Sequence, residues 1–357
     1  MAAGQGRGDD FPVRADLSLA IRDADLLVER EAARGKPGFE FTERALALRQ
    51  AERDRFAALS PNARRRATTR AQLDATPDRD DLRHVHSVLA ICGLPYKSLP
   101  IDVRAFERKQ GNMALDVSAG FLRDDRGEQM VQPLPYGPKA RLILMHLCSQ
   151  AIYNKSPTID LSETFTGFVR ELGFNDSGGP RGALTAFKHQ LNALAACSMS
   201  VSVWQPGVRV RTERITPIKS FDLWLSENMH QRALWPSNLT FSLDFYESLK
   251  THALPVNIRA VRVFAGSART LDAYYWLSYR ITRLPKTTMI SWEALAQQFG
   301  GDYARLRDFR KAFADDLRVI SDVFPKLPVK LSEVGLELSP AGPEVLALPA
   351  PRPTRKK

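Results

Sequence analysis

The sequence contains little cysteine, and that cysteine is not arranged for a cross-linked or metal-bound fold. Three cysteines occur in 357 residues, at Cys92, Cys148 and Cys197, far apart and without a C-x-x-C pair. This spacing excludes a disulfide framework and a cysteine zinc site. Each cysteine lies among apolar residues, so we expect all three to be small buried core side chains.

Long hydrophobic runs and nucleotide-binding motifs are also lacking. No apolar stretch approaches the roughly 20 residues that a membrane helix needs, and MAAGQGRGDDFPV at the N-terminus has no apolar segment of the signal-peptide kind. RGKPG at 34–38 lacks the frame of a phosphate-binding loop, which argues against an ATPase of that class. We expect a cytoplasmic protein with no membrane contact, no cofactor, no metal and no enzymatic activity.

Positive charge is abundant and unevenly distributed. The net charge is +11, of which residues 1–80 supply +1 and the remaining 277 residues supply +10. The excess therefore lies in the part of the chain that we expect to fold, and it favours a polyanionic partner. Mere solubility is the alternative interpretation of the same composition.

The two ends of the chain differ in composition from its middle. Residues 1–80 have few large apolar residues and predict a disordered or loosely helical arm, with a helix at Phe41–Leu59 that could be an arm or a dimerising segment. NARRRATTR at 62–70 is a basic run of the solvated kind. Residues 343–357 predict a basic flexible tail.

Between these ends, one pattern of elements occurs twice. The first copy predicts a helix at Lys139–Tyr153, an extended piece near Ile159, and a helix that is capped by Ser162 and stopped by Gly173. A third helix and a hairpin at 198–215 follow. The apolar stripes of the two later helices are Phe165, Phe168, Val169 and Leu172, then Leu184, Phe187, Leu191 and Leu194.

The second copy repeats this order. It predicts a helix at 268–284, an extended piece at Met289–Ile290, a helix capped by Ser291, a third helix, and a hairpin with Val329 and Leu331 opposite Leu336 and Leu338. Its stripes are Trp292, Leu295, Ala296 and Phe299, then Leu306, Phe309, Phe313, Leu317 and Ile320.

Helix, strand, helix, helix and hairpin is the order of a winged helix-turn-helix. The fold that we predict is mainly α with small β-hairpins (α+β), built from tandem winged helix-turn-helix domains. The first domain is expected at 81–228 and the second at 229–342.

The third helix of each copy is the element that would enter the major groove of DNA. In the hairpin of the first copy, Val208 and Val210 alternate with Arg209 and Arg211, which predicts one apolar and one basic face. The residues expected to contact double-stranded DNA are Arg181, Thr185, Lys188, His189, Asn192, Arg209, Arg211, Arg305, Arg307, Arg310, Lys311, Arg318 and Lys330.

The second copy is the more basic of the two and is predicted to be the main reader of DNA sequence, since arginine supplies both charge and a fork that pairs with guanine. The first copy would contribute backbone contacts and could also form the surface of a homodimer. Asp308 and Asp315 lie beside the basic stripe of the second copy, where they would repel phosphate or pair with neighbouring cations.

A catalytic interpretation rests on HVH at 84–86, because replication nickases use two histidines of this spacing with a nucleophilic tyrosine. Tyr136 and Lys139 have y-x-x-K spacing. Against this, HVHSVLAICGL is typical of a helix or loop rather than a central strand, and no further ligand lies nearby. The other histidines are isolated.

Several long phrases resemble the plasmid-encoded RepA replication initiators of Gram-negative bacteria. They are GLPYKSLP, PLPYGPKARLILMHLCSQAI, FDLW, LWPSNLTFSLDFYESLKTHALPVNIRA, LDAYYWLSYRI and SWEALAQQFG, which follow one another in the same order within roughly 85–340. Residues 1–80 match nothing in the family.

The resemblance implies a sequence-specific initiator that binds repeated sites (iterons) in a plasmid origin, helps to open adjacent AT-rich DNA, and recruits the host initiator and replicative helicase. It also implies two winged-helix domains and, in many members, a DNA-binding monomer that alternates with an autorepressing dimer, with consequences for plasmid copy control. A transcriptional repressor with two winged helices remains open as an alternative, because the same residues would serve it.

Overall fold

The computed structural model describes residues 21, 23–74, 79–124, 126–161, 165–174, 182–205, 207, 209–215, 217–221 and 238–349. The chain divides into two compact units, Met1–Thr68 and Thr69–Lys357. In the described parts, the chain combines helices with small antiparallel sheets, which agrees with the predicted α+β class. No helix there is both long enough and apolar enough to cross a membrane.

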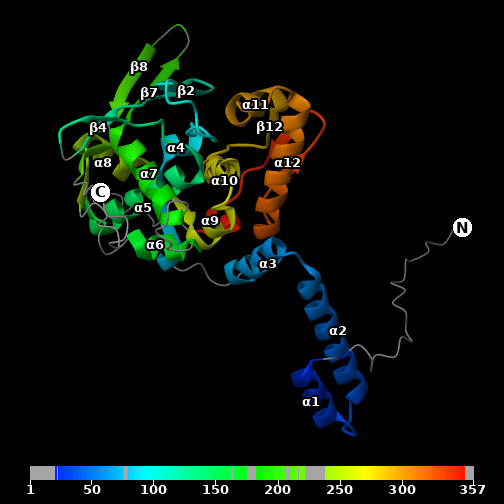
Figure 1. Ribbon diagram of the computed structural model, residues 1–357. Helices are drawn as coiled ribbons and strands as arrows, with labels where there is room; N and C mark the ends of the chain where they lie inside the picture. The colour runs from blue at the N-terminus through cyan, green and yellow to red at the C-terminus, as the bar shows by residue number, and fades with distance from the viewer. Residues whose placement is uncertain are drawn as a thin grey trace, which may run out of the picture. The chain divides into compact units, whose positions relative to one another are not determined.

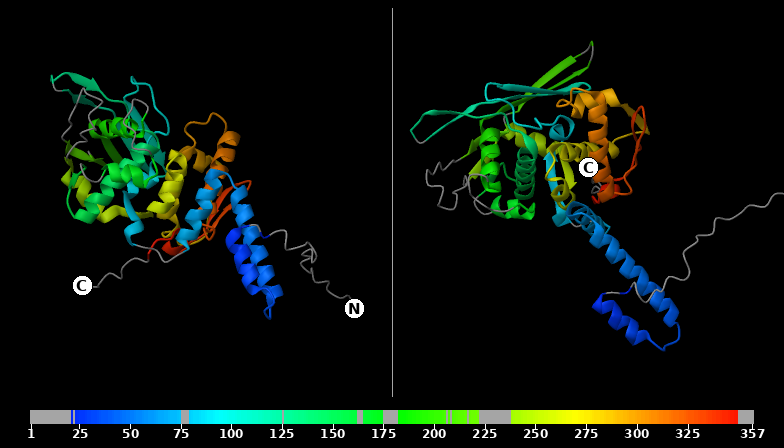
Figure 2. Two further views of the ribbon diagram at one scale, coloured as in Figure 1. Left: turned by 60° about the horizontal axis from the view of Figure 1, so that its bottom comes forward. Right: turned by 45° about the vertical axis from the view of Figure 1, so that its right-hand side comes forward.

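The first unit contains a helical hairpin. Figure 2 shows its two helices, α1 and α2, folded back along each other. Its small core consists of Ile21, Leu26, Leu46 and Ala47. The predicted helix at Phe41–Leu59 is thus present as α2. The helices in and after this unit are α1 (Ala24–Ala33), α2 (Phe39–Ala58) and α3 (Pro61–Leu73).

The helices of the second unit surround one continuous apolar core that includes residues of both repeats. They are η2 (Arg79–Asp81), α4 (Ser87–Ile91), α5 (Gly137–Asn154), α6 (Phe165–Glu171), α7 (Ala183–Ala196), α8 (Leu243–His252), α9 (Ile258–Phe264), α10 (Ala268–Ile281), α11 (Trp292–Phe299), α12 (Leu306–Val323) and η3 (Pro343–Leu346).

The strands pair in small antiparallel sheets with the orders β1-β11, β6-β10-β9, β12-β14-β13, β2-β3-β7-β8 and β4-β5. The right-hand view of Figure 2 shows the long strands of the β2-β3-β7-β8 sheet above α5 and α7. The strands are β1 (Leu82–His86), β2 (Ala105–Gln110), β3 (Met113–Ser118), β4 (Phe121–Arg123), β5 (Gln129–Val131), β6 (Thr158–Asp160), β7 (Ser198–Gln205), β8 (Arg209–Ile215), β9 (Ile218–Phe221), β10 (Asn238–Phe241), β11 (Ala253–Asn257), β12 (Thr288–Ser291), β13 (Val329–Leu331) and β14 (Gly335–Leu338).

The elements predicted for the second repeat are present in the predicted order. Ser291 caps α11 by accepting a hydrogen bond from the Ala294 amide at 3.2 Å. Val329 lies opposite Leu338, and Leu331 lies opposite Leu336, as the hairpin pattern predicted. Figure 1 shows α12 standing beside α11 and β12. One residue differs: Leu306 is 37% exposed, because the first turn of α12 projects beyond the core that Phe309 and Phe313 enter.

The first repeat begins as predicted with α5, β6 and α6. Gly173 ends α6 with a φ of 79°, a left-handed backbone that glycine adopts without strain. The Phe174 amide then bonds to the Val169 carbonyl at 3.2 Å, which is the hydrogen bond of a Schellman C-cap. The proposed cap at Ser162 lies outside the described residues.

The hairpin of the first repeat forms as β7 and β8, but its register corrects one prediction. Val210 pairs with Trp204, and Arg211 pairs with Val203. Directly opposite residues of an antiparallel pair share a face. Val210 is therefore not on the face of Val203, and the predicted division into one apolar and one basic face is wrong. The turn shifts the register by one residue, which the alternation within each strand does not reveal.

The predicted tail at 343–357 also begins too early. Leu346 and Leu348 are buried in the core, and the Asn257 side chain donates a hydrogen bond to the Ala347 carbonyl at 3.2 Å. The three cysteines are free and buried, as expected, and burial raises the pKa of each thiol to about 12. The predicted domain boundary near 228 stays a prediction.

Candidate nucleic-acid interface

The helix α12 has one buried face and one exposed face. Phe309, Phe313, Leu317 and Ile320 are spaced by three or four residues and are at most 2% exposed. This apolar stripe fixes the rotation of α12 about its axis, because burying it removes four large side chains from water. The exposed charged residues of α12 consequently lie on the sides of the helix that face away from this buried stripe.

The exposed face of α12 is basic at its N-terminal end. Arg305, Arg307 and Lys311 are exposed. The guanidinium of Arg310 is partly buried and lies 5.1 Å from the centre of the Trp292 ring. A helix N-terminus carries a partial positive charge from its unpaired amides, which adds to the attraction for anions. This end of α12 is therefore suited to phosphate.

Two exposed acidic side chains of α12 form ion pairs with arginines of the same helix. Asp308 is 3.6 Å from the Nε of Arg307, and the side chains are 52% and 83% exposed, so this exposed contact holds Arg307 weakly. Asp315 forms an ion pair with Arg318 farther along the helix. The side chains of this pair are 70% and 53% exposed, so Arg318 is also held weakly, but it lies away from the basic N-terminal end.

The hairpin β13–β14 is anchored next to α12 through α11. The indole nitrogen of Trp292 donates a hydrogen bond to the Ser332 carbonyl at 3.1 Å, and the Trp292 amide donates to Val334 at 3.3 Å. Lys330 is exposed on β13 and lies opposite Glu337. Trp292 thus contacts both Arg310 and the β13–β14 hairpin that carries Lys330. Arg310 and Lys330 therefore belong to one packed unit.

The corresponding face of α7 is less accessible. Thr185, Lys188 and Asn192 are partly buried, and His189 is exposed. The Oδ1 atom of Asn192 is buried and has no hydrogen-bond partner within the described residues. The helix packs against α5 and also contacts β4 and β9. These neighbours leave less of its polar face open than α12 presents.

The remaining predicted contacts of the first repeat are only partly described. Arg181 lies outside the described residues. Arg209 and Arg211 belong to β8, where Arg209 pairs with Gln205 and Arg211 pairs with Val203 of β7.

The histidine pair at 84–86 lies on a strand, which corrects the expectation of a helix or loop. His84 and His86 belong to β1, which pairs with β11. Burial lowers the pKa of both imidazoles to about 4, with a further lowering from the charge of Arg83 on His84 and of His252 on His86. His86 also caps α4 by accepting from the Val88 amide at 3.3 Å.

Both histidines pack against aromatic rings, and His86 also lies beside a serine hydroxyl. The His86 ring stacks on Phe245 at 5.3 Å, and its Nε2 lies 3.0 Å from the Ser248 hydroxyl. His84 meets the ring of Tyr153 edge-on at 5.5 Å. In the described part of the chain, no group of three or more His, Cys, Asp or Glu side chains is arranged to hold a metal ion.

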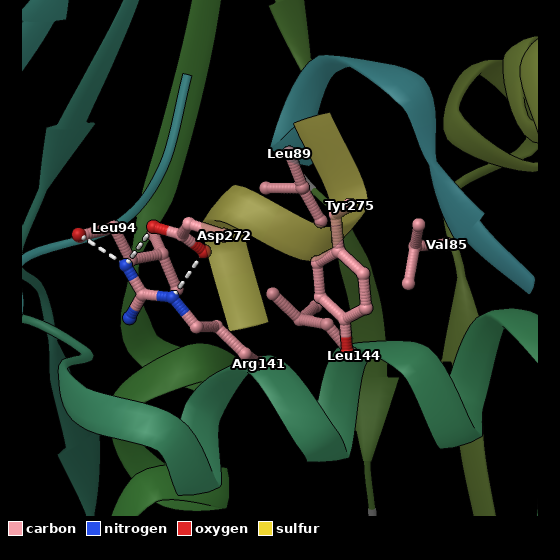
Figure 3. Close-up of a pocket in the computed structure, with 7 residues that line it drawn as sticks. All are labelled: Val85, Leu89, Leu94, Arg141, Leu144, Asp272 and Tyr275. Carbon is pink, nitrogen blue, oxygen red and sulfur yellow. Dashed lines mark hydrogen bonds and ion pairs between the residues drawn. The ribbon is translucent and has the colours of Figure 1, made fainter. Parts of the chain in front are cut away.

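A buried ion pair that the sequence patterns missed joins the first helices of the two repeats. Arg141 of α5 donates from Nε and Nη2 to the Asp272 carboxylate of α10, at 2.6 Å and 2.7 Å (Figure 3). Its guanidinium also donates to the carbonyls of Leu94, Pro95 and Gly137. A single cation within the apolar run ARLILMHLC was the available signal, because a buried arginine requires a partner.

The fold and this site define a mixed α/β chain whose helix α12 presents a basic end beside a β-hairpin. Residues 134–294 match the family model described as plasmid encoded RepA protein. This segment belongs to that family, as the motifs indicated. It includes α5, α7 and α10, whereas α12 and the β13–β14 hairpin follow it in the chain.

Two crystal structures are similar to the chain at low sequence identity. One contains domains 2 and 3 of RctB as selenomethionine derivatives, with 11% identity, a TM-score of 0.44, and coverage of 71% of this chain and 97% of that chain. The other contains RctB domains 2-3, with 12% identity, a TM-score of 0.43, and coverage of 73% and 100%. No curated protein matches the chain.

Proposed function

We propose that this chain initiates plasmid replication by binding repeated sites in the plasmid origin sequence-specifically. By its family, it would also help to open adjacent AT-rich DNA and recruit the host initiator and replicative helicase. The match of residues 134–294 to the plasmid encoded RepA protein family supports the replication role. The observation that carries the DNA-binding part is the exposed basic end of α12.

The tandem winged-helix architecture is part of this proposal. In the second repeat, α10, β12, α11 and α12 precede a hairpin whose strands join β12 in the order β12-β14-β13. This is the arrangement expected of a winged helix-turn-helix. The first repeat has the same order along the chain, but β6 pairs with β10 and the hairpin extends the β2-β3 sheet.

Within this architecture, α12 is the proposed reader of base sequence. Three of its basic residues, Arg305, Arg307 and Lys311, are exposed near its N-terminus, where recognition helices usually contact bases. An exposed arginine can pair with two acceptor atoms of guanine. The proposed role of α7, through Thr185 and its neighbours, and of Lys330 is to contact the phosphate backbone.

The test is binding of the full chain to the direct repeats beside its gene, compared with a shuffled duplex of equal length. Fluorescence anisotropy at fixed salt would give both dissociation constants. We expect a preference of at least about 10³-fold for the repeats, the lower end for specific DNA-binding proteins. Equal affinity for the two duplexes would contradict sequence-specific binding.

A repressor of its own gene is the second proposal, because the same surface would serve it. A maintenance test distinguishes the initiator from the repressor, with a plasmid whose only origin carries the repeats. If the chain supplied in trans maintains that plasmid, it acts as an initiator. If it binds the repeats and lowers transcription without supporting maintenance, repression is its function.

We propose that the chain acts without catalysis. The nickase interpretation predicts strand cleavage of supercoiled origin DNA with a divalent metal. The buried position of His86 and the partly buried position of His84 on β1 speak against it. Nicking that is lost in a Tyr136→Phe variant would restore that interpretation.

A further inference from the structure

A pocket lies where the turn between β2 and β3 approaches α10 and α11 (Figure 1). Its volume is about 490 Å³, which falls within the roughly 300–1,000 Å³ of small-molecule binding sites. Two other pockets, beside Tyr275 and Phe245, hold only about 10 Å³ each. None of the described residues that line the larger pocket belongs to α12, so it is distinct from the basic end of that helix.

The walls of this pocket are partly apolar and are held in place by hydrogen bonds. Ile91, Met113 and Ile290 line it and are partly buried. Gln298 of α11 fixes the junction, because its Nε2 donates to the Ile91 carbonyl at 2.9 Å and also to the side-chain oxygen of Gln110 on β2. A ligand would therefore meet a surface that is already formed, which lowers the entropy cost of binding it.

Arg280 of α10 supplies the charge of the pocket. Its guanidinium lies 5.5 Å from the centre of the Trp276 ring, and its Nε is buried without a hydrogen-bond partner in the described structure. Burial lowers the pKa of this guanidinium, and Tyr279 is the neighbour that opposes the lowering. No carboxylate of the described residues forms an ion pair with Arg280. A partly desolvated cation without a counter-charge favours an anionic ligand.

The charges around the pocket indicate which anion fits. Lys109 also lines it, but its Nζ lies 2.9 Å from the Glu107 carboxylate, so these two residues contribute no net charge. Arg280 is left as one uncompensated positive charge. A carboxylate carries one negative charge, whereas a phosphate monoester carries nearly two. The arginine fork also matches the two oxygens of a carboxylate, and we therefore favour a carboxylate over a phosphate.

Two amide side chains at the pocket indicate what else a ligand could offer. Asn112 in the β2–β3 turn and Gln297 of α11 are exposed and line the pocket. Neither side chain makes a hydrogen bond within the described residues. Each amide provides both donors and an acceptor, which complement the N–H and C=O of a peptide group.

We propose that this pocket binds an apolar carboxylate, whose oxygens pair with Arg280 and whose apolar body packs against Ile91, Met113 and Ile290. Two sources share this chemistry, a free aliphatic acid and the carboxyl terminus of a peptide that ends in an apolar residue. The peptide terminus adds an amide for Asn112 and Gln297. The ligand fastens the β2–β3 turn to α10 and α11, and its binding does not depend on DNA.

The first test compares charged probes with their uncharged amides on the full chain. The probes are N-acetyl-leucine, which represents a peptide terminus, and hexanoate, which represents a free acid. Ligand-observed NMR titrations at fixed low salt would give the dissociation constants, which should be on the order of 1 mM for probes of this size. We expect at least one acid to bind about tenfold or more tightly than its own amide, because the charged hydrogen bond is lost in the amide.

The two acids distinguish the source of the ligand. Tighter binding of N-acetyl-leucine than of hexanoate identifies a peptide terminus, and the reverse order identifies a free acid. If neither acid binds more tightly than its amide, the proposal is wrong.

Arg280→Gln tests the assigned cation. This variant should bind the acid and its amide equally, so the preference of about tenfold disappears. Arg283→Gln is the matched control, because Arg283 lies three residues later, stacks on Tyr279 at 4.3 Å and does not line the pocket. Circular dichroism and urea unfolding would show whether both variants fold. A folded Arg280→Gln variant that keeps the wild-type preference would overturn the proposal.

Ala294→Glu gives a second variant that leaves Arg280 in place. Ala294 is exposed, lines the pocket and lies three residues after the cap Ser291, a position where glutamate favours the helix. The new carboxylate would repel the ligand and compete for Arg280, so we expect the acid to bind about tenfold or more weakly. Unchanged binding of the acid would contradict the proposed site. Repeat DNA binding by these variants is a separate readout, which tests α12 and not the pocket.

Discussion

Arg307 is the side chain at which the DNA-binding proposal is most directly tested. It is exposed and is held only weakly by Asp308. We expect Arg307→Ala to weaken binding to the cognate repeat by about 1–3 kcal/mol and to relax preference at one base position. Arg310→Ala should do the same but also removes a contact with Trp292, so Arg307 gives the cleaner result.

Arg318→Ala is the matched control on the same helix. Arg318 lies eleven residues after Arg307, roughly 16 Å farther along the helix axis from the basic N-terminal end, so its loss should change binding by less than about 0.5 kcal/mol. Asn192→Ala on α7 should also cost less than Arg307→Ala. If Asn192→Ala abolished discrimination while Arg307→Ala left it intact, the first repeat would be the reader.

The ion pair of Arg141 and Asp272 makes a prediction about stability. Burial opposes the charge on Arg141, but the carboxylate of Asp272 outweighs this effect, so the pKa of Arg141 is raised. Asp272→Asn keeps the shape and leaves a buried cation without its counter-charge. We expect urea unfolding to show a loss of about 3–5 kcal/mol. Asp315→Asn, in an exposed pair, should cost at most about 1 kcal/mol.

Two buried histidines, His86 and His146, and the partly buried His84 predict sensitivity to acid. Burial lowers the pKa of His84 and His86 to about 4 and that of His146 to about 3, from an ordinary value of about 6.5. The unfolded chain therefore binds these protons first. Stability should be fully present above pH ~6.5 and should fall as the pH approaches ~4, by up to about 1.4 kcal/mol per pH unit for each histidine.

Urea titrations of wild type and His86→Gln between pH ~7 and ~4 would measure this effect. In the variant, the slope of the unfolding free energy against pH should decrease by the contribution of one histidine, up to about 1.4 kcal/mol per pH unit. The His252 ring lies 6.0 Å from that of His86, and its charge contributes to the lowered pKa of His86, so His252→Gln is the control for coupling. Equal slopes in wild type and His86→Gln would contradict the assignment.

At the scale of elements, one face of α12 packs in the core and another is exposed and proposed to bind DNA. Phe309 is fully buried, whereas Leu306, three residues earlier, is 37% exposed. We expect Phe309→Ala to destabilise the protein by about 3–5 kcal/mol through the cavity that it leaves. Leu306→Ala should cost less than about 1 kcal/mol, because that side chain already contacts water.

Thermal or urea unfolding of the two variants would check this difference. A Leu306→Ala variant as unstable as Phe309→Ala would mean that the first turn of α12 packs against something absent from the described structure. The distinction also matters for binding, because Leu306 lies between Arg305 and Arg307.

At the scale of the whole molecule, the net charge of +11 predicts binding that weakens steeply with salt. Lys330 is exposed on the β13–β14 hairpin and is expected to contact a phosphate. Lys330→Ala should reduce the slope of log K against log salt by about 1 and weaken binding equally on all sequences. Lys250→Ala, whose side chain pairs with Glu247, is the control. A loss confined to the cognate repeat would make Lys330 a base reader.

Local patterns in the sequence determined much of the second repeat. The spacing of Trp292, Leu295 and Phe299 identified the buried face of α11, and Ser291 identified its start. The hairpin register of Val329 and Leu331 followed from strict alternation. These features depend on residues within a few positions of one another, and such short-range preferences can be read from sequence alone. The basic residues of α12 were found for the same reason.

Only the tertiary structure decided what depends on distant segments. The four-stranded sheet joins β2 and β3 to β7, which lies about 85 residues later, and no local pattern encodes that pairing. The turn between β7 and β8 set a register that overturned the predicted faces. Packing of α7 against β4 and β9 decided how far Asn192 is covered. Asp272 became the partner of Arg141 across 131 positions, because a buried charge is satisfied by whichever segment the fold brings to it.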